Sequence, residues 1–113
     1  MLAITTRDVG KCVILDCSGK LTSGPGVTAL RDAVRTAVKA GHSRVVLNLK
    51  EVEYSDSCGI GELVSSMTHV QNQGGRLILL NLNKYLERML MITKLLPVFE
   101  IHDDEGSALA ECR

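Results

Sequence analysis

The side chains best suited to chemistry in this chain gather in residues 55–61, which read Ser-Asp-Ser-Cys-Gly-Ile-Gly. The segment follows an apolar, strand-like run at residues 45–49 and leads into a stretch whose apolar side chains repeat with the period of a helix. A helix N-terminus has unpaired N–H groups and a partial positive charge, so it favours a phosphate. The glycines leave little bulk around the central hydroxyl, so another protein could approach closely. We therefore interpret Ser57 as a phosphorylatable hydroxyl within a docking surface.

An enzyme that uses Ser57 or Cys58 as its nucleophile is an alternative. Such an enzyme needs a base beside the nucleophile, and only His42 and His69 are candidates. His42 stands near the end of the first expected helix, opposite the motif, and His69 lies about three helical turns beyond the motif. The serine also lacks the Gly-x-Ser-x-Gly elbow of an esterase. The sequence therefore predicts no catalytic residues and no enzymatic activity.

The remaining polar residues indicate neither a metal site nor a cofactor site. The histidines, His42, His69 and His102, are scattered, and no two of them stand with a cysteine at the spacing of a zinc site. The glycine-rich segment at residues 19–26 lacks the Lys-Ser/Thr ending of a P-loop. We expect no bound metal and no cofactor.

Length and composition limit the class of protein. The chain has 113 residues, which predicts a single domain over residues 1–113. Apolar residues make up 45% of it and aromatic residues 3%, so the core must be aliphatic and few rings are available to stack on bases. Thirteen Lys and Arg balance thirteen Asp and Glu, without a block of one sign that would attract nucleic acid or an anionic membrane. A protein partner is therefore favoured over both.

The N-terminal sequence and the cysteines bear on the compartment. The first residues lack the charged start and apolar segment of a secretory signal, and no apolar run approaches the roughly eighteen residues of a membrane span. The four cysteines, Cys12, Cys17, Cys58 and Cys112, include no Cys-x-x-Cys pair. We expect reduced thiols in a cytoplasmic protein.

Strand-like and helix-like segments alternate along the chain. The expected strands cover residues 2–6, 11–17, 44–50, 76–82 and 98–101. The expected helices run from residue 27 to a glycine stop at 41, from 60 to about 73, from 84 to 93, and from 103 onward. This alternation predicts an α/β domain with a single-layer, mostly parallel sheet of four to five strands and about four helices. Because binding loops gather at the carboxyl ends of parallel strands, the loops at residues 19–26 and 56–61 are expected to be neighbours.

Residues 56–61, Asp-Ser-Cys-Gly-Ile-Gly, resemble the Asp-Ser-Ser/Thr-Gly-Leu/Ile-Gly signature of the STAS-domain anti-sigma factor antagonists. Residues 19–22 are similar to that family's Gly-x-Leu/Ile-Asp/Thr segment before the first helix, and residues 72–77 to its Gly-Gly turn before the next strand. Phe99 and the acidic start of the last helix also fit. The resemblance covers nearly the whole chain and implies a STAS-like fold.

The resemblance further implies a partner-switching protein. In that family the unmodified antagonist binds an anti-sigma factor, which is a serine kinase of the ATPase type, and a sigma factor is released. The kinase phosphorylates the motif serine, here Ser57, and the phosphorylated form dissociates. A serine phosphatase of the metal-dependent class then restores binding. The partner-binding residues implied for this chain are Thr22, Asp56, Ser57, Cys58, Gly59, Gly61 and Glu62.

Several roles stay open at this point. Cys58 replaces the family's second Ser or Thr, and because a thiol is a weak hydrogen-bond partner, secondary phosphorylation is lost there. Ser57 could serve as a helix cap as well as a phosphoacceptor. Asp56 could cap the helix, orient the hydroxyl, or contact a nucleotide-bound metal ion held by the kinase. Thr22 could contact the kinase or only shape its turn. A non-phosphorylated STAS accessory subunit of a bacterial transport ATPase complex is the alternative function, and a monomer or weak dimer is expected.

Overall fold

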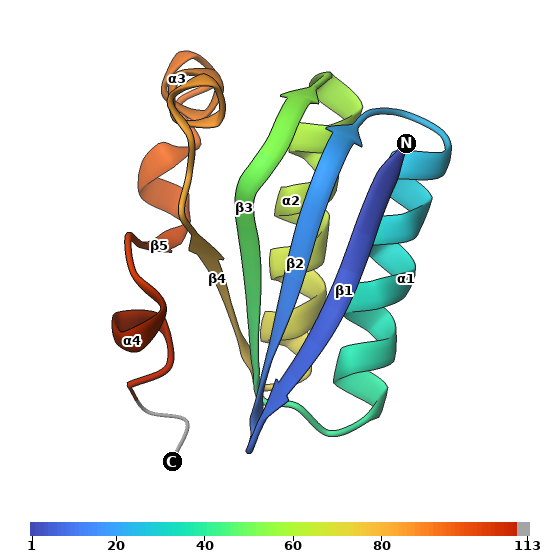
Figure 1. The fold of residues 1–113 in the computed structure, drawn as a ribbon, viewed down its shortest axis with the longest axis vertical. Helices are drawn as coiled ribbons and strands as arrows, with labels where there is room; N and C mark the ends of the chain where they lie inside the picture. Colours follow the sequence, from blue (N-terminus) through green and yellow to red (C-terminus); the bar gives the residue numbers. More distant parts are fainter. Residues whose placement is uncertain (111–113) are drawn as a thin grey trace.

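The computed structural model describes residues 1–110. Its strands are β1 (Leu2–Val9), β2 (Cys12–Leu21), β3 (Arg44–Ser55), β4 (Arg76–Leu80) and β5 (Glu100–His102). Its helices are α1 (Pro25–Lys39), α2 (Ser57–Asn72), α3 (Lys84–Ile92) and α4 (Glu105–Ala108), with a 3₁₀ turn at Leu96–Val98. The strands form one sheet in the order β1-β2-β3-β4-β5, in which only the β1–β2 hairpin is antiparallel. The predicted α/β fold, with a mostly parallel sheet of five strands and four helices, is confirmed (Figure 1).

The two faces of the sheet are covered unequally. α1 and α2 lie side by side over one face, and α4 lies against the other (Figure 1). Alternate residues of β2 accordingly enter different cores: Val13 and Leu15 pack under α1 and α2, whereas Ile14 packs with Ala108 of α4. Among residues 1–110, Phe99 is the only aromatic residue that is buried in the larger core, so the core is aliphatic, as the composition indicates.

β2 is longer than the sequence pattern predicts, and it continues to the end of the sheet at which α2 begins. Residues 19–21 belong to the strand rather than to a loop, and they pair with β3 until Leu21 lies opposite Ser55. Two register shifts interrupt this pairing, and Gly19 adopts a positive φ of 107° next to one of them. These irregularities break the alternation of buried and exposed residues from which a strand is recognised.

Other boundaries also differ from the prediction. β1 extends to Val9 and β3 to Ser55, beyond the predicted ends at residues 6 and 50. α1 begins at Pro25, two residues earlier than predicted, because proline is well suited to the first turn of a helix. The last strand begins at Glu100 rather than at residue 98, since Pro97 lies in the 3₁₀ turn that precedes it.

The state of the cysteines differs from the expectation. Cys17 and Cys58 are free, but Cys12 is disulfide-bonded, so the prediction of reduced thiols is wrong for Cys12. Cys112 lies outside the described residues. Because disulfides are rare in the cytosol, the cysteines no longer support a cytoplasmic location. Within residues 1–110 no helix combines the length and apolar character that crossing a membrane requires.

Candidate functional site

The carboxyl ends of β2 and β3 bring two distant loops together. Leu21 and Ser55 are paired across the two strands, so the loops that follow them start side by side. The backbone N–H of Ser23 in the first loop donates to a carboxylate oxygen of Asp56 in the second, at 2.9 Å. The predicted proximity of these two loops is confirmed.

Asp56 is the residue that caps α2. One of its carboxylate oxygens accepts the N–H of Gly59 at 2.9 Å, and the other accepts the N–H of Ser23. The N–H of Ser23, followed by that of Gly59, lowers the pKa of Asp56 below its ordinary value of 3.8. The carboxylate therefore joins the start of α2 to the loop before α1, and its capping role is confirmed.

Ser57 is the first residue of α2, and its side chain is exposed. Since Asp56 provides the cap, the alternative that Ser57 is the helix cap is wrong. No hydrogen bond from another residue within 1–110 holds the Ser57 hydroxyl. Cys58, the next residue, is also exposed and carries a free thiol. The hydroxyl is thus accessible to another protein.

The two glycines of the motif have different surroundings. Gly59 is buried, and a Cβ placed there would collide with the carbonyl oxygen of Leu21 and the hydroxyl of Ser55. A Cβ at Gly61 would meet no atom within 4 Å outside its own helix turn. Gly59 is therefore required by the close approach of α2 to β2, whereas Gly61 leaves an open surface. Gly59 is buried and does not serve partner access as expected, whereas the partner-access role of Gly61 stays a prediction.

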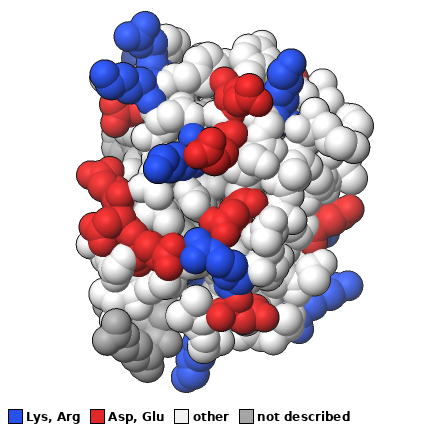
Figure 2. Space-filling model, in the orientation of Figure 1, with Lys and Arg blue, Asp and Glu red and all other residues white. Residues whose placement is uncertain are grey.

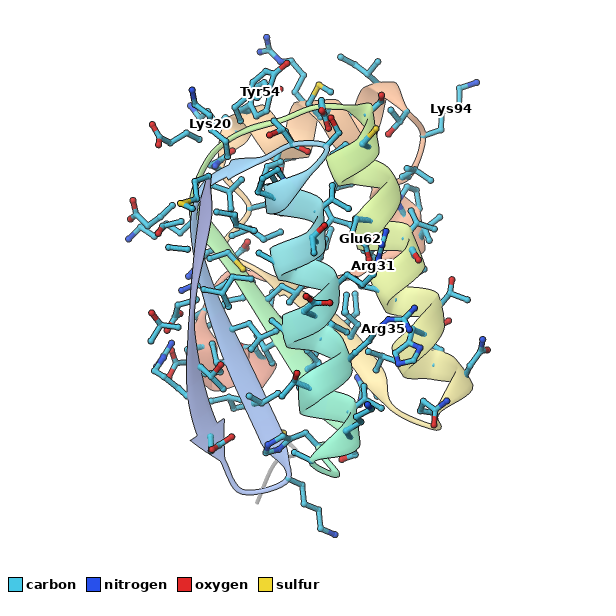
Figure 3. All side chains as sticks on the ribbon, turned by 90° about the vertical axis from the view of Figure 1, so that its right-hand side faces the viewer. Lys20, Arg31, Arg35, Tyr54, Glu62 and Lys94 are labelled. Atoms are coloured by element: carbon cyan, nitrogen blue, oxygen red, sulfur yellow. The ribbon has the colours of Figure 1, made fainter. Side chains whose placement is uncertain are left out.

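Glu62, which the resemblance implies to be a partner-binding residue, is buried between α1 and α2. Its side chain is 4% exposed, and Arg31 of α1 donates to it from Nη2 at 2.8 Å and from Nε at 3.1 Å. The Ser66 hydroxyl donates to the second carboxylate oxygen at 3.0 Å. Figure 3 shows Arg31 and Glu62 meeting between the two helices. Glu62 therefore joins α1 to α2 and is not available to a partner.

Thr22 stands at the beginning of the first loop, next to the Ser23 that bonds to Asp56. It is half-buried, and its carbonyl oxygen accepts the N–H of Val27 at 3.0 Å, which closes the turn into α1. The turn role is thus present, and the residue lies on the same end of the molecule as Ser57.

Two tyrosines border this end and were missed by the sequence analysis. The rings of Tyr54 and Tyr85 stack with their centroids 5.7 Å apart. The Tyr85 hydroxyl donates to the carbonyl oxygen of Ser55 at 2.9 Å, so α3 is held against the end of β3. The chain is poor in aromatic residues and has only these two tyrosines, so their positions in the sequence could have indicated a role at this end.

The histidines that could activate a nucleophile lie elsewhere. His42 pairs with Asp8 at 3.0 Å, at the opposite end of the parallel strands. His69 stands twelve residues after Ser57 on α2, roughly 18 Å along the helix axis. Among residues 1–110 no three His, Cys, Asp or Glu side chains form a group that could hold a metal ion.

Comparison with known proteins identifies the family. The STAS domain model matches residues 3–108. A Thermotoga neapolitana protein that is named for the anti-sigma factor antagonists is 35% identical over 71 residues, so the match spans 63% of this chain and 63% of that relative.

Two solved structures share the whole fold. A protein of Thermotoga maritima assigned to the anti-sigma factor antagonists has a TM-score of 0.86 at 26% identity, covering 97% of this chain and 94% of that one. The Bacillus cell fate determinant SpoIIAA in its phosphorylated form has a TM-score of 0.74, covering 98% and 100% of the two chains, and at 23% identity it shows the fold alone. The family model covers nearly all of the described residues, and the chain belongs to the STAS domain family.

Proposed function

We propose that this protein is an anti-sigma factor antagonist whose binding is switched by phosphorylation of Ser57. In the unmodified form it binds an anti-sigma factor that is a serine kinase of the ATPase type. The phosphorylated form dissociates, and a serine phosphatase of the metal-dependent class restores it. The observation that carries the proposal is the exposed hydroxyl at the first residue of α2, beside the loop that Asp56 holds in place.

The names of relatives support this assignment. The Thermotoga neapolitana relative is named for anti-sigma factor antagonists, and SpoIIAA, which has this fold, has been solved in a phosphorylated form. The docking surface that we propose comprises Thr22, Asp56, Ser57, Cys58 and Gly61, without the buried Gly59 and Glu62.

A phosphate on Ser57 would change the surface more than the fold. It adds about 1.5 to 2 negative charges at pH 7. The exposed position lets water solvate this charge while the chain is free, and the partial positive charge of the helix start offsets part of it. In a packed interface the same phosphate must lose its water, and it lies next to the Asp56 carboxylate. A tenfold to hundredfold loss of affinity needs only about 1.4 to 2.8 kcal/mol.

The proposal extends to the class and setting of the protein. It acts as a binding protein rather than an enzyme, in the cytoplasm, as a monomer or weak dimer. Figure 2 shows Lys, Arg, Asp and Glu interspersed over the face in view, which favours a protein partner over nucleic acid or a membrane.

Two measurements test the proposal. Purified ATPase-type anti-sigma kinases of the same organism are incubated with the protein and ATP, and the intact mass is measured for wild type and Ser57→Ala. We expect one added phosphate on the wild type and none on the variant. In a pull-down, Ser57→Ala should bind the kinase, and Ser57→Asp should bind it at least about tenfold more weakly. Equal binding of the two variants would refute the switch, and absence of phosphate with every kinase would favour a non-phosphorylated accessory subunit instead.

A further inference from the structure

One face of α3 exposes apolar side chains that the fold does not use. Lys84, Glu87, Arg88, Met91 and Ile92, here called the α3 stripe, lie on one side of the helix and line a shallow depression of 350 Å³. Met91 is 59% exposed and Ile92 is 69% exposed.

The opposite face of α3 provides its contact with the core. Leu86 and Leu90 are fully buried there, and the Asn83 side chain caps the helix by accepting the N–H of Leu86. Neither Met91 nor Ile92 belongs to either core cluster. Two large adjacent apolar side chains left in water, beside further exposed stripe residues, are typical of an interaction surface.

α3 is fixed to the strand that leads to Ser57. The Asn83 amide donates to the carbonyl oxygen of Val52 at 2.6 Å, and the Tyr85 hydroxyl donates to that of Ser55 at 2.9 Å. Tyr54, which stacks on Tyr85, is 46% exposed and directly precedes the motif in sequence. The start of α2 and the stripe are therefore parts of one rigid platform.

The figures place both surfaces at one end of the molecule. In Figure 1, α3 lies at the level where β3 ends and α2 begins. In Figure 3, seen from the side, Tyr54 and Lys94 again mark that end. One protein that covers Ser57 could thus reach the stripe without a change in the fold.

The charge around the stripe indicates the chemistry of its occupant. Lys84, Arg88 and Lys94 are exposed cations, Glu87 is the one acidic residue among them, and within residues 1–110 none of the four has an ion-pair partner. A segment with apolar side chains flanked by Asp or Glu would complement this pattern.

We propose that the α3 stripe is a second docking site for the kinase that phosphorylates Ser57, and that it takes an acidic, apolar segment of that kinase. This inference rests on the proposed function. Because a phosphate on the exposed Ser57 side chain breaks neither of the hydrogen bonds that hold α3 to β3, the stripe contributes equally to binding of the unmodified and the phosphorylated chain. The state of Ser57 then determines the ratio of the two affinities, and the stripe strengthens both affinities by the same factor.

The test compares Met91→Ser/Ile92→Ser with Val9→Ser in the full chain. Val9 is a matched control because it is also an exposed apolar residue, at 36%, and it lies at the other end of the parallel strands. Kd for each purified ATPase-type kinase is measured by calorimetry, in the Ser57→Ala and the Ser57→Asp background. We expect the double variant to weaken both affinities about tenfold with their ratio unchanged, and Val9→Ser to have no effect. Thermal unfolding of each variant, followed by circular dichroism, shows that the fold is kept.

The outcomes separate the two proposals. If a kinase binds wild type and the stripe variant equally well, the inference is wrong and the switch at Ser57 stands. If the variant loses only binding to vesicles of anionic lipid, or only a dimer of the wild type seen by sedimentation, the stripe has a different occupant and the inference is again wrong. If no kinase binds or phosphorylates the wild type, both proposals fall.

Discussion

Alanine at Gly59 and alanine at Gly61 should have opposite effects on stability. Both positions lie in α2, so alanine relieves the entropic cost of glycine in a helix at each of them, by about 0.5–1 kcal/mol in a helix interior and less near the helix start. At Gly61 the new methyl group enters open space, and the variant should be as stable as wild type or more stable.

At Gly59 the methyl group must displace backbone. It would collide with the carbonyl oxygen of Leu21, which cannot rotate away as a side chain could, and with the Ser55 hydroxyl. Overpacking of this kind costs about 1–3 kcal/mol. Alanine gains a similar amount of helix propensity at both positions, so the difference in stability between the two variants measures this steric cost.

Thermal unfolding followed by circular dichroism measures this difference. One kcal/mol shifts the melting temperature of a domain of this size by about 4 °C, so Gly59→Ala should melt about 4–12 °C below Gly61→Ala. A melting temperature of Gly59→Ala at or above that of Gly61→Ala would refute the account of why α2 approaches β2 so closely.

Three further perturbations probe an ion pair between two helices, the cap of α2, and the exposure of two thiols. Arg31→Ala leaves a buried carboxylate without its ion-pair partner and should cost about 1–3 kcal/mol in urea unfolding, whereas the exposed neighbour Arg35→Ala should change stability by less than about 0.5 kcal/mol. Because the fold lowers the pKa of Asp56 below 3.8, its ionised form stabilises the folded state above about pH 4, and this contribution is lost as pH falls through the folded-state pKa. The Asp56→Asn variant should therefore be less stable than wild type at pH 7, and its urea midpoint should fall less than that of wild type as the pH is lowered below 4. The same pH dependence of the urea midpoint in both proteins would contradict the capping geometry. Cys58 should react with a maleimide in the folded protein, while Cys17, whose pKa burial raises to about 12, should react only after unfolding.

The elements of this fold are largely predictable because each has a local cause. The apolar run at residues 44–50 and the helical period after Ile60 come from burial on one or two faces. The strand ends were not predictable. Residues 19–21 contain a glycine and a lysine, and they join the sheet only because β3 continues beside them to Ser55.

The candidate site also has residues whose position could be predicted from the sequence and residues whose position could not. An exposed serine at a helix start follows from the motif itself, and the structure confirms its place. Glu62 looked like a surface acid, since a single charged residue in a helix is normally solvated. Its burial depends on Arg31, thirty-one residues earlier on another helix, and no local pattern in the chain records that partner.

The contacts that hold these elements also limit how the proposed switch can act. Glu62 joins α2 to α1, Asp56 joins α2 to the loop before α1, and Tyr85 joins α3 to β3. An exposed phosphate on Ser57 breaks none of these contacts, and moving α1, α2 or α3 would break at least one of them. A change of charge and bulk at the surface is therefore sufficient, without a rearrangement of the fold.

This reasoning predicts a local spectroscopic response. When the protein is phosphorylated, amide chemical shifts in a ¹H–¹⁵N spectrum should change at residues 22–23 and 56–61, which surround the hydroxyl. The amide chemical shifts of α3 and of the second half of α2 should not change. The unmodified Ser57→Ala chain provides the control for the loss of the hydroxyl alone. Shifts that spread through α3 would mean that the phosphate moves the platform, and the affinity loss would then have a conformational cause. Confinement of the shifts to the two loops leaves charge and desolvation at the interface as the cause of release.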